Sequence, residues 1–137
     1  KWDDIVRQKI AENPQFKGVY FVDIWDSTRF GHDSEGKKFE FPRFPMISRK
    51  AVDIAGFFFF PQMRNWPADK VVWNLYTSVG CIIKCHEVKL QHDHNFDHTG
   101  DPTKSRFLRI LNEDIANGVF PIDARPQCQA LYDAINN

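Results

Sequence analysis

The chain has 137 residues, of which 42% are hydrophobic and 15% aromatic, and its formal net charge is +0 at pH 7. This composition excludes a disordered segment, and the balanced charge gives no broad basic surface for nucleic acid or an anionic membrane. No apolar run approaches the ~20 residues that span a bilayer, so we expect no transmembrane segment. The length fits a single domain over residues 1–137, or one half of a larger domain.

The cysteine count bears on the cellular compartment. Three cysteines, an odd number, argue against a disulfide framework and for a reducing environment, so we expect a cytoplasmic protein. No signal peptide is visible. The chain begins at Lys1 without a methionine, which is also consistent with a fragment.

The first part of the chain predicts a helix, a buried strand and a long loop. Residues 2–13 carry a helical apolar stripe. Residues 19–25, VYFVDIW, form an apolar run typical of a buried strand. Asp23 interrupts this run and is either functional or a local cap. Residues 26–45 predict a long loop, part of which forms a short edge strand.

The next elements are bounded by clear capping residues. Ser48 predicts the start of a short helix, and Gly56 its end. We expect most of the aromatic rings of GFFFFP, residues 56–61, to lie in the core. A helix is predicted from Pro67 to a glycine stop at residue 80, followed by a strand over residues 82–90.

Two further helices close the chain. The first begins at Asp101-Pro102 and ends near Gly118, and the second begins at Pro126. In the first we expect four apolar residues to face inward: Phe107, Leu108, Leu111 and Ile115. Strands interleaved with helices indicate an α/β fold, a mixed sheet flanked by helices.

The segment from residue 65 to residue 98 holds most of the candidate functional side chains. Asp69 falls in the first turn of a predicted helix, where the helix dipole favours a carboxylate. Trp66 beside it forms an aromatic and acidic pair of the kind that binds sugars. The alternative is that Trp66 only staples the helix entry and Asp69 is only a first-turn acid.

His92 and His94 are the candidate metal ligands. In a strand their side chains point to the same side and could meet one cation, and the alternative is a solvated polar loop. A structural zinc site is a weaker possibility, because strand alternation should place Cys81 and Cys85 on one side roughly 13 Å apart. Ordinary buried cysteines fit these two positions better.

Glu87 and Lys89 open a different possibility. Together with Asp69 they resemble the acid and E-x-K element of a metal-dependent nuclease or phosphodiesterase. The neutral net charge argues against a broad phosphate-binding surface.

Five segments, in order, resemble the C-terminal, acceptor-side half of nucleotide-sugar glycosyltransferases with the A-type fold. They are KWDDIVRQKI, KGVYFVDIWD, FPMISRKAVDIAGFFFFPQM, NWPADKVVWNLYTSVGCII and HEVKLQHDHNFDHTGDPTKSRF. The resemblance implies transfer of a sugar from a nucleotide-diphosphate donor to a hydroxyl acceptor, assisted by Mn²⁺ or Mg²⁺. No Asp-x-Asp stands where the family has it, which implies that an N-terminal, nucleotide-binding half is missing.

The resemblance also implies roles for individual residues. Asp69 matches the family's catalytic or acceptor-orienting acid, with Ala68 in place of the usual glutamate. Trp66 and Arg49 correspond to the acceptor pocket, and Arg106 to the diphosphate site.

His92 matches the histidine that completes the metal shell, and His94 lies close to it. A second hypothesis is a non-catalytic carbohydrate- or protein-binding module that keeps the acceptor pocket without the donor site. The nuclease remains a third.

Overall fold

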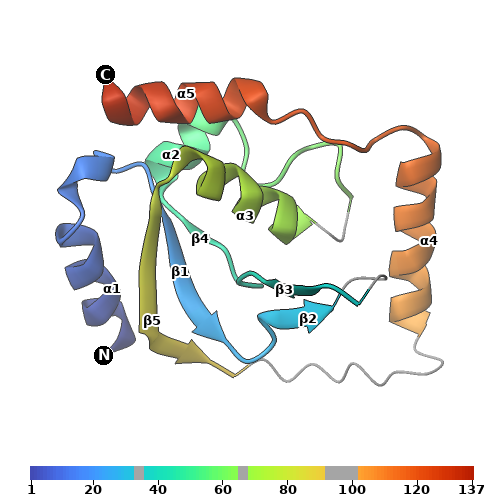
Figure 1. Cartoon of the computed structure of the whole chain (residues 1–137), viewed down its shortest axis with the longest axis horizontal. Helices are drawn as coiled ribbons and strands as arrows, with labels where there is room; N and C mark the ends of the chain where they lie inside the picture. The colour runs from blue at the N-terminus through green and yellow to red at the C-terminus, as the bar shows by residue number, and fades with distance from the viewer. Residues whose placement is uncertain (33–35, 65–67, 92–101) are drawn as a thin grey trace.

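The computed structural model describes residues 1–32, 36–64, 68–91 and 102–137 (Figure 1). Within these residues the chain forms an α/β fold of five α-helices and a three-stranded mixed sheet packed against helices. The elements in chain order are α1 (Trp2–Ala11), η1 (Pro14–Phe16), β1 (Phe21–Asp26), β2 (Phe30–His32), β3 (Lys38–Glu40), β4 (Met46–Ile47), α2 (Arg49–Ala55), α3 (Ala68–Val79), β5 (Ile82–Leu90), α4 (Pro102–Ala116) and α5 (Arg125–Asn136).

The sheet has the strand order β4-β1-β5, with β1 in the centre. β1 pairs in parallel with β5 and antiparallel with β4. Strands β2 and β3 form a separate antiparallel pair within the predicted long loop. The predicted mixed α/β sheet is therefore confirmed among the described residues.

Helices cover both faces of the sheet (Figure 1). On one face α1 packs against β5 over an apolar cluster that we call the α1-side core; it comprises Val6, Val22, Ile24, Ile83, Cys85 and Val88. On the other face α2, α3 and α5 pack over the α3-side core, which comprises Val19, Phe21, Ala51, Phe60, Met63, Val72, Leu75, Tyr76, Cys81 and Leu131. Burial on both faces explains why β1 is a continuous apolar run rather than an alternating one.

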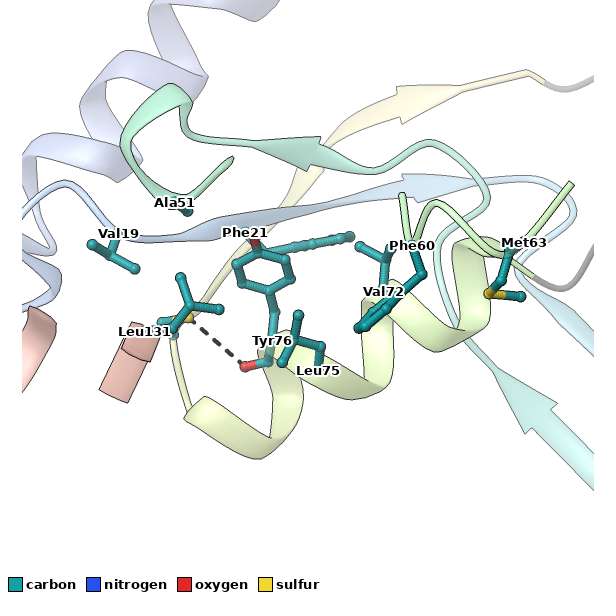
Figure 2. Packing of buried hydrophobic residues seen from close by; sticks show 10 residues of the cluster. Val19, Phe21, Ala51, Phe60, Met63, Val72, Leu75, Tyr76 and Leu131 are labelled. Atoms are coloured by element: carbon teal, nitrogen blue, oxygen red, sulfur yellow. Dashed lines mark hydrogen bonds between the residues drawn. The ribbon is translucent and has the colours of Figure 1, made fainter. Parts of the chain in front are cut away.

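Figure 2 shows the α3-side core, in which aromatic rings from β1 and α3 meet. The ring of Phe21 lies 5.4 Å from that of Trp73 and 5.8 Å from that of Tyr76. Leu131 of α5 is fully buried in the same cluster. The Cys81 thiol donates to the Tyr76 carbonyl at 3.8 Å, so the start of β5 is tied to the end of α3 (Figure 2).

Both predicted boundaries of α2 and the predicted end of α3 are confirmed, and the predicted start of α3 at Pro67 lies outside the described residues. The Ser48 hydroxyl accepts a hydrogen bond from the Ala51 N–H at 3.1 Å, as an N-cap does. Gly56 and Gly80 follow these helices at φ +88° and +79°, a left-handed conformation that favours glycine over residues with a Cβ.

Two burial predictions were wrong. Phe60 is buried, but Phe58 and Phe59 are 38% and 41% exposed and pack edge to face against each other. On α4, Leu108 and Ile115 are 42% and 57% exposed rather than inward. Figure 1 shows α4 beyond the β2–β3 hairpin, away from the sheet, so no apolar layer covers its whole predicted stripe.

Candidate functional site

Asp69 lies in the first turn of α3, as predicted, and its side chain is half-buried. Its Oδ1 atom accepts a hydrogen bond from the Lys70 N–H at 2.9 Å. Burial raises the pKa of the Asp69 carboxyl above its ordinary value, and the negative charge of Asp26 adds to this rise. The hydrogen bond from the Lys70 N–H and the positive charge of Arg43 lower the pKa by a smaller amount. A carboxylate in this setting is a better proton acceptor than one on the open surface.

Asp26 is the last residue of β1, and its carboxylate accepts hydrogen bonds from both ends of the long loop. It is fully buried, and its Oδ1 atom accepts hydrogen bonds from the N–H and hydroxyl of Thr28, both at 2.9 Å. Its Oδ2 atom accepts from the N–H of Arg43 at 3.0 Å. These bonds hold the backbone of Arg43 at the carboxyl end of β1, where α/β folds commonly place functional groups.

The guanidinium of Arg43 lies over the ring of Phe41, with its Cζ atom 4.5 Å from the ring centroid. Phe41 is itself 3% exposed, so the stacked guanidinium rests on an immobile surface. We call Asp26, Arg43 and Asp69 the Asp69 cluster. In this cluster the charges of Arg43 and Asp26 act in opposite directions on the pKa of the Asp69 carboxyl.

Two of the other residues predicted for the site, Arg49 and Arg106, are described by the structure, and both are exposed. Trp66, His92 and His94 lie outside the described residues. Arg49 is exposed in the first turn of α2 and pairs with Asp53 on its own helix at 2.7 Å. Arg106 is exposed on α4.

No group of three metal-binding side chains converges within the described part of the chain. The prediction that Cys81 and Cys85 share one side was wrong. Cys81 belongs to the α3-side core and Cys85 to the α1-side core. Strand alternation did not apply, because Cys81 precedes the first residue of β5. Both cysteines are buried free thiols.

The residues of the nuclease hypothesis are held by other partners. Glu87 pairs with Lys9 of α1 at 2.7 Å. The Lys89 ammonium lies 5.6 Å from the ring centroid of Trp25. Both residues line a groove of about 310 Å³ beside α1, whereas the charges that act on Asp69 are those of Arg43 and Asp26. The structure thus gives Glu87 and Asp69 different charged neighbours.

A second polar cluster joins β1, β5 and the β2–β3 hairpin. The sequence pattern did not predict this cluster. The Oδ2 atom of Asp23 lies 2.7 Å from His86 Nε2 and 3.2 Å from Arg29 Nη2. Arg29 also donates from Nε to Glu40 at 2.8 Å and from Nη1 to the Ile24 carbonyl at 3.2 Å. We call Asp23, Arg29, Glu40 and His86 the Asp23 cluster.

The sequence held a partial signal for the second cluster. Asp23 is a carboxylate inside an apolar strand, and in the structure it binds His86 and Arg29 rather than capping a helix or forming a turn. Nothing local indicated that residues 63 positions apart would meet.

Comparisons with known protein families, curated proteins and solved structures find no match to this chain. The resemblance to glycosyltransferases therefore rests on the five sequence segments. Among the described residues, no helix is both long enough and apolar enough to cross a membrane.

Proposed function

We propose that this chain is the acceptor-side half of a nucleotide-sugar glycosyltransferase, in which Asp69 accepts the proton of the attacking hydroxyl. The observation that carries the proposal is the position of Asp69, half-buried in the first turn of α3, where burial raises the pKa of its carboxyl. The resemblance of the same segment to the family's acidic helix agrees with it. The proposal includes the A-type fold as the finer class of this α/β chain.

The reaction needs a base, because a neutral hydroxyl is a poor nucleophile. In the proposed step, the acceptor oxygen bonds to the anomeric carbon as the bond from that carbon to the diphosphate breaks. The hydroxyl proton passes to the Asp69 carboxylate and then to solvent, while the departing diphosphate keeps the bonding electrons. The higher pKa that burial gives Asp69 favours this transfer.

The remaining parts of the proposal lie around this step. Trp66 and Arg49 would contact the acceptor, and Arg106 the diphosphate. His92 and His94 would be ligands of Mn²⁺ or Mg²⁺, and they fall outside the residues whose geometry is described. A bound divalent cation would supply positive charge to the departing diphosphate. A cytoplasmic location, with the three cysteines as free thiols, completes the proposal.

The test is a transfer assay on the native polypeptide, including any further domain that it carries in its source. UDP- and GDP-sugars are supplied with Mn²⁺ and a panel of methyl glycosides as acceptors, and release of nucleoside diphosphate is measured. We expect Asp69→Asn to lower kcat by about 10²–10⁴-fold, the usual contribution of a general base.

The matched control is Asp4→Asn, the same chemical change at an exposed position in the first turn of α1, which should leave kcat unaltered. Full activity in Asp69→Asn would remove Asp69 from the mechanism. Binding of sugars without transfer from any donor would favour the non-catalytic binding module.

A further inference from the structure

A groove of about 310 Å³ opens beside α1, near the carboxyl ends of β1 and β5. We call it the α1 groove, and six apolar side chains line it: Trp2, Ile5, Ile24, Met46, Val88 and Leu90. Two come from α1, one each from β1 and β4, and two from β5. Because β1 and β5 are parallel, the groove lies at the edge of the sheet where α/β folds commonly bind ligands.

The exposure of these side chains rises from the floor of the groove to its rim. Ile24 and Val88 are buried members of the α1-side core, and Met46 packs against that core and is partly buried. At the rim, Trp2 is 61% exposed and Leu90 is 37% exposed. Isolated exposed apolar residues need no explanation, but several that line one hollow indicate a binding surface.

Two charged residues, Glu87 and Lys89, complete the lining, and each is already matched. The Glu87 carboxylate pairs with the Lys9 ammonium at 2.7 Å. The Lys89 ammonium lies 5.6 Å from the ring centroid of Trp25. A charged ligand would have to separate one of these pairs, whereas a neutral ligand leaves both in place.

The size and chemistry of the lining favour an aromatic ligand. The volume is at the lower end of the roughly 300–1,000 Å³ of ligand pockets, which suits one or two rings. The exposed indole of Trp2 offers a flat apolar face, on which aromatic rings stack or meet edge to face. The thioether of Met46 makes favourable contacts with ring edges and adapts to their outline.

We propose that the α1 groove is a binding site for a neutral aromatic molecule of one or two rings. The rings lie on Ile24 and Val88, and Trp2 and Met46 hold them from the sides. The proposal goes beyond sugar transfer and does not depend on it, because the α1 groove shares no residue with the Asp69 cluster.

The experiment is NMR of the native polypeptide with ¹³C-methyl-labelled methionine. The chain has two methionines, Met46 in the α1 groove and Met63 in the α3-side core on the other face of the sheet. The variant Met46→Leu assigns their signals. Naphthol, indole and benzyl alcohol are titrated as neutral probes, and naphthoate and naphthylmethylammonium as their charged counterparts.

At least one neutral probe should displace the Met46 methyl resonance saturably through its ring current, with a Kd of about 1 mM. The Met63 resonance should stay in place, because its methyl group lies in a different core. The charged counterparts should bind at least about tenfold more weakly, because they lose hydration or break an existing pair.

Variants separate binding in the groove from a general change in the protein. Leu90→Glu places a carboxylate at the rim and should weaken binding about tenfold. Trp2→Ala should weaken it about three- to tenfold by removing one aromatic contact. The matched control is Leu108→Glu, the same change at a leucine of α4 that is 42% exposed, which should bind as the wild type does.

Four outcomes would overturn the proposal. They are no saturable displacement of Met46 by any neutral probe, equal displacement of Met63, tighter binding of a charged counterpart, or displacement of Met46 by protein concentration alone. The last would mean that a second copy of the chain covers the groove. All are read on the wild-type protein, and none bears on transfer by Asp69, so the two proposals fail separately.

Discussion

Replacement of Leu131 by alanine should destabilise the protein far more than the same change at Leu108. Both are leucines on amphipathic helices near the C-terminus, and sequence periodicity predicts that both face inward. In the structure Leu131 of α5 is 0% exposed within the α3-side core (Figure 2), whereas Leu108 of α4 is 42% exposed. The pair therefore tests the tertiary arrangement rather than helix formation.

The magnitude for Leu131→Ala follows from its complete burial. Three carbon atoms lose an apolar environment, which costs roughly 2–2.5 kcal/mol. The rigid neighbours, among them the rings of Phe21 and Tyr76, cannot fill the cavity completely, so the total rises to about 3–4 kcal/mol. For a chain of 137 residues this corresponds to a fall in Tm of about 10–15 °C.

The assay is urea and thermal unfolding followed by circular dichroism for the wild type, Leu131→Ala and Leu108→Ala. Leu108→Ala should change the free energy of unfolding by no more than about 0.5 kcal/mol. An equal loss in the two variants would refute the reasoning, because α4 would then bury the stripe that its periodicity predicts. A small loss in both would mean that α5 does not seal the α3-side core.

Three further predictions concern individual polar groups. Arg64→Ala should speed amide exchange throughout α4 and lower Tm, because the nearly buried Asp114 loses a hydrogen-bond partner at 2.8 Å. Arg109→Ala should do neither, because it removes only an exposed ion pair with Glu113. Iodoacetamide should label Cys128 first and leave Cys81 intact in the folded protein, because burial raises the pKa of the Cys81 thiol to about 12; mass spectrometry that finds Cys81 alkylated first would contradict this. Burial raises the pKa of Asp69 above 3.8 in the folded protein, so ionisation of this carboxyl lowers the stability of the folded state. The stability from the protonated form is present in acid and is lost as pH rises through the pKa of Asp69 in the folded protein. Asp69→Asn should therefore be more stable than the wild type at pH 7, with a difference in Tm that shrinks towards the acid range, and a difference independent of pH would count against the shift.

Several features of the fold could be predicted from local sequence because the interactions behind them are local. The Ser48 cap joins atoms three residues apart, and the glycines after α2 and α3 act through their own backbone angles. The apolar run of β1 predicted a strand buried on both faces. Asp69 was placed correctly in the first turn of α3 for the same reason, since only the start of one helix had to be located.

Other features depended on what packs against an element. The amphipathic pattern of α4 does not reveal that this helix lies away from the sheet, where Leu108 stays exposed. Alternation along β5 failed at Cys81, because the residue belongs to the turn after α3 rather than to the strand. The aromatic run after α2 divides into buried and exposed rings, which composition alone does not distinguish.

The sequence by itself determined the α/β class, both caps of α2, the glycine stop after α3, and Asp69 as a first-turn acid. Each of these follows from torsion preferences and hydrogen bonds that span a few residues. Only the tertiary structure decided that Asp23 meets His86 across 63 positions and that the N–H of Arg43 donates to Asp26 at the end of β1. Those contacts depend on the parallel pairing of β1 with β5 and on the return of a long loop, and no local pattern specifies either.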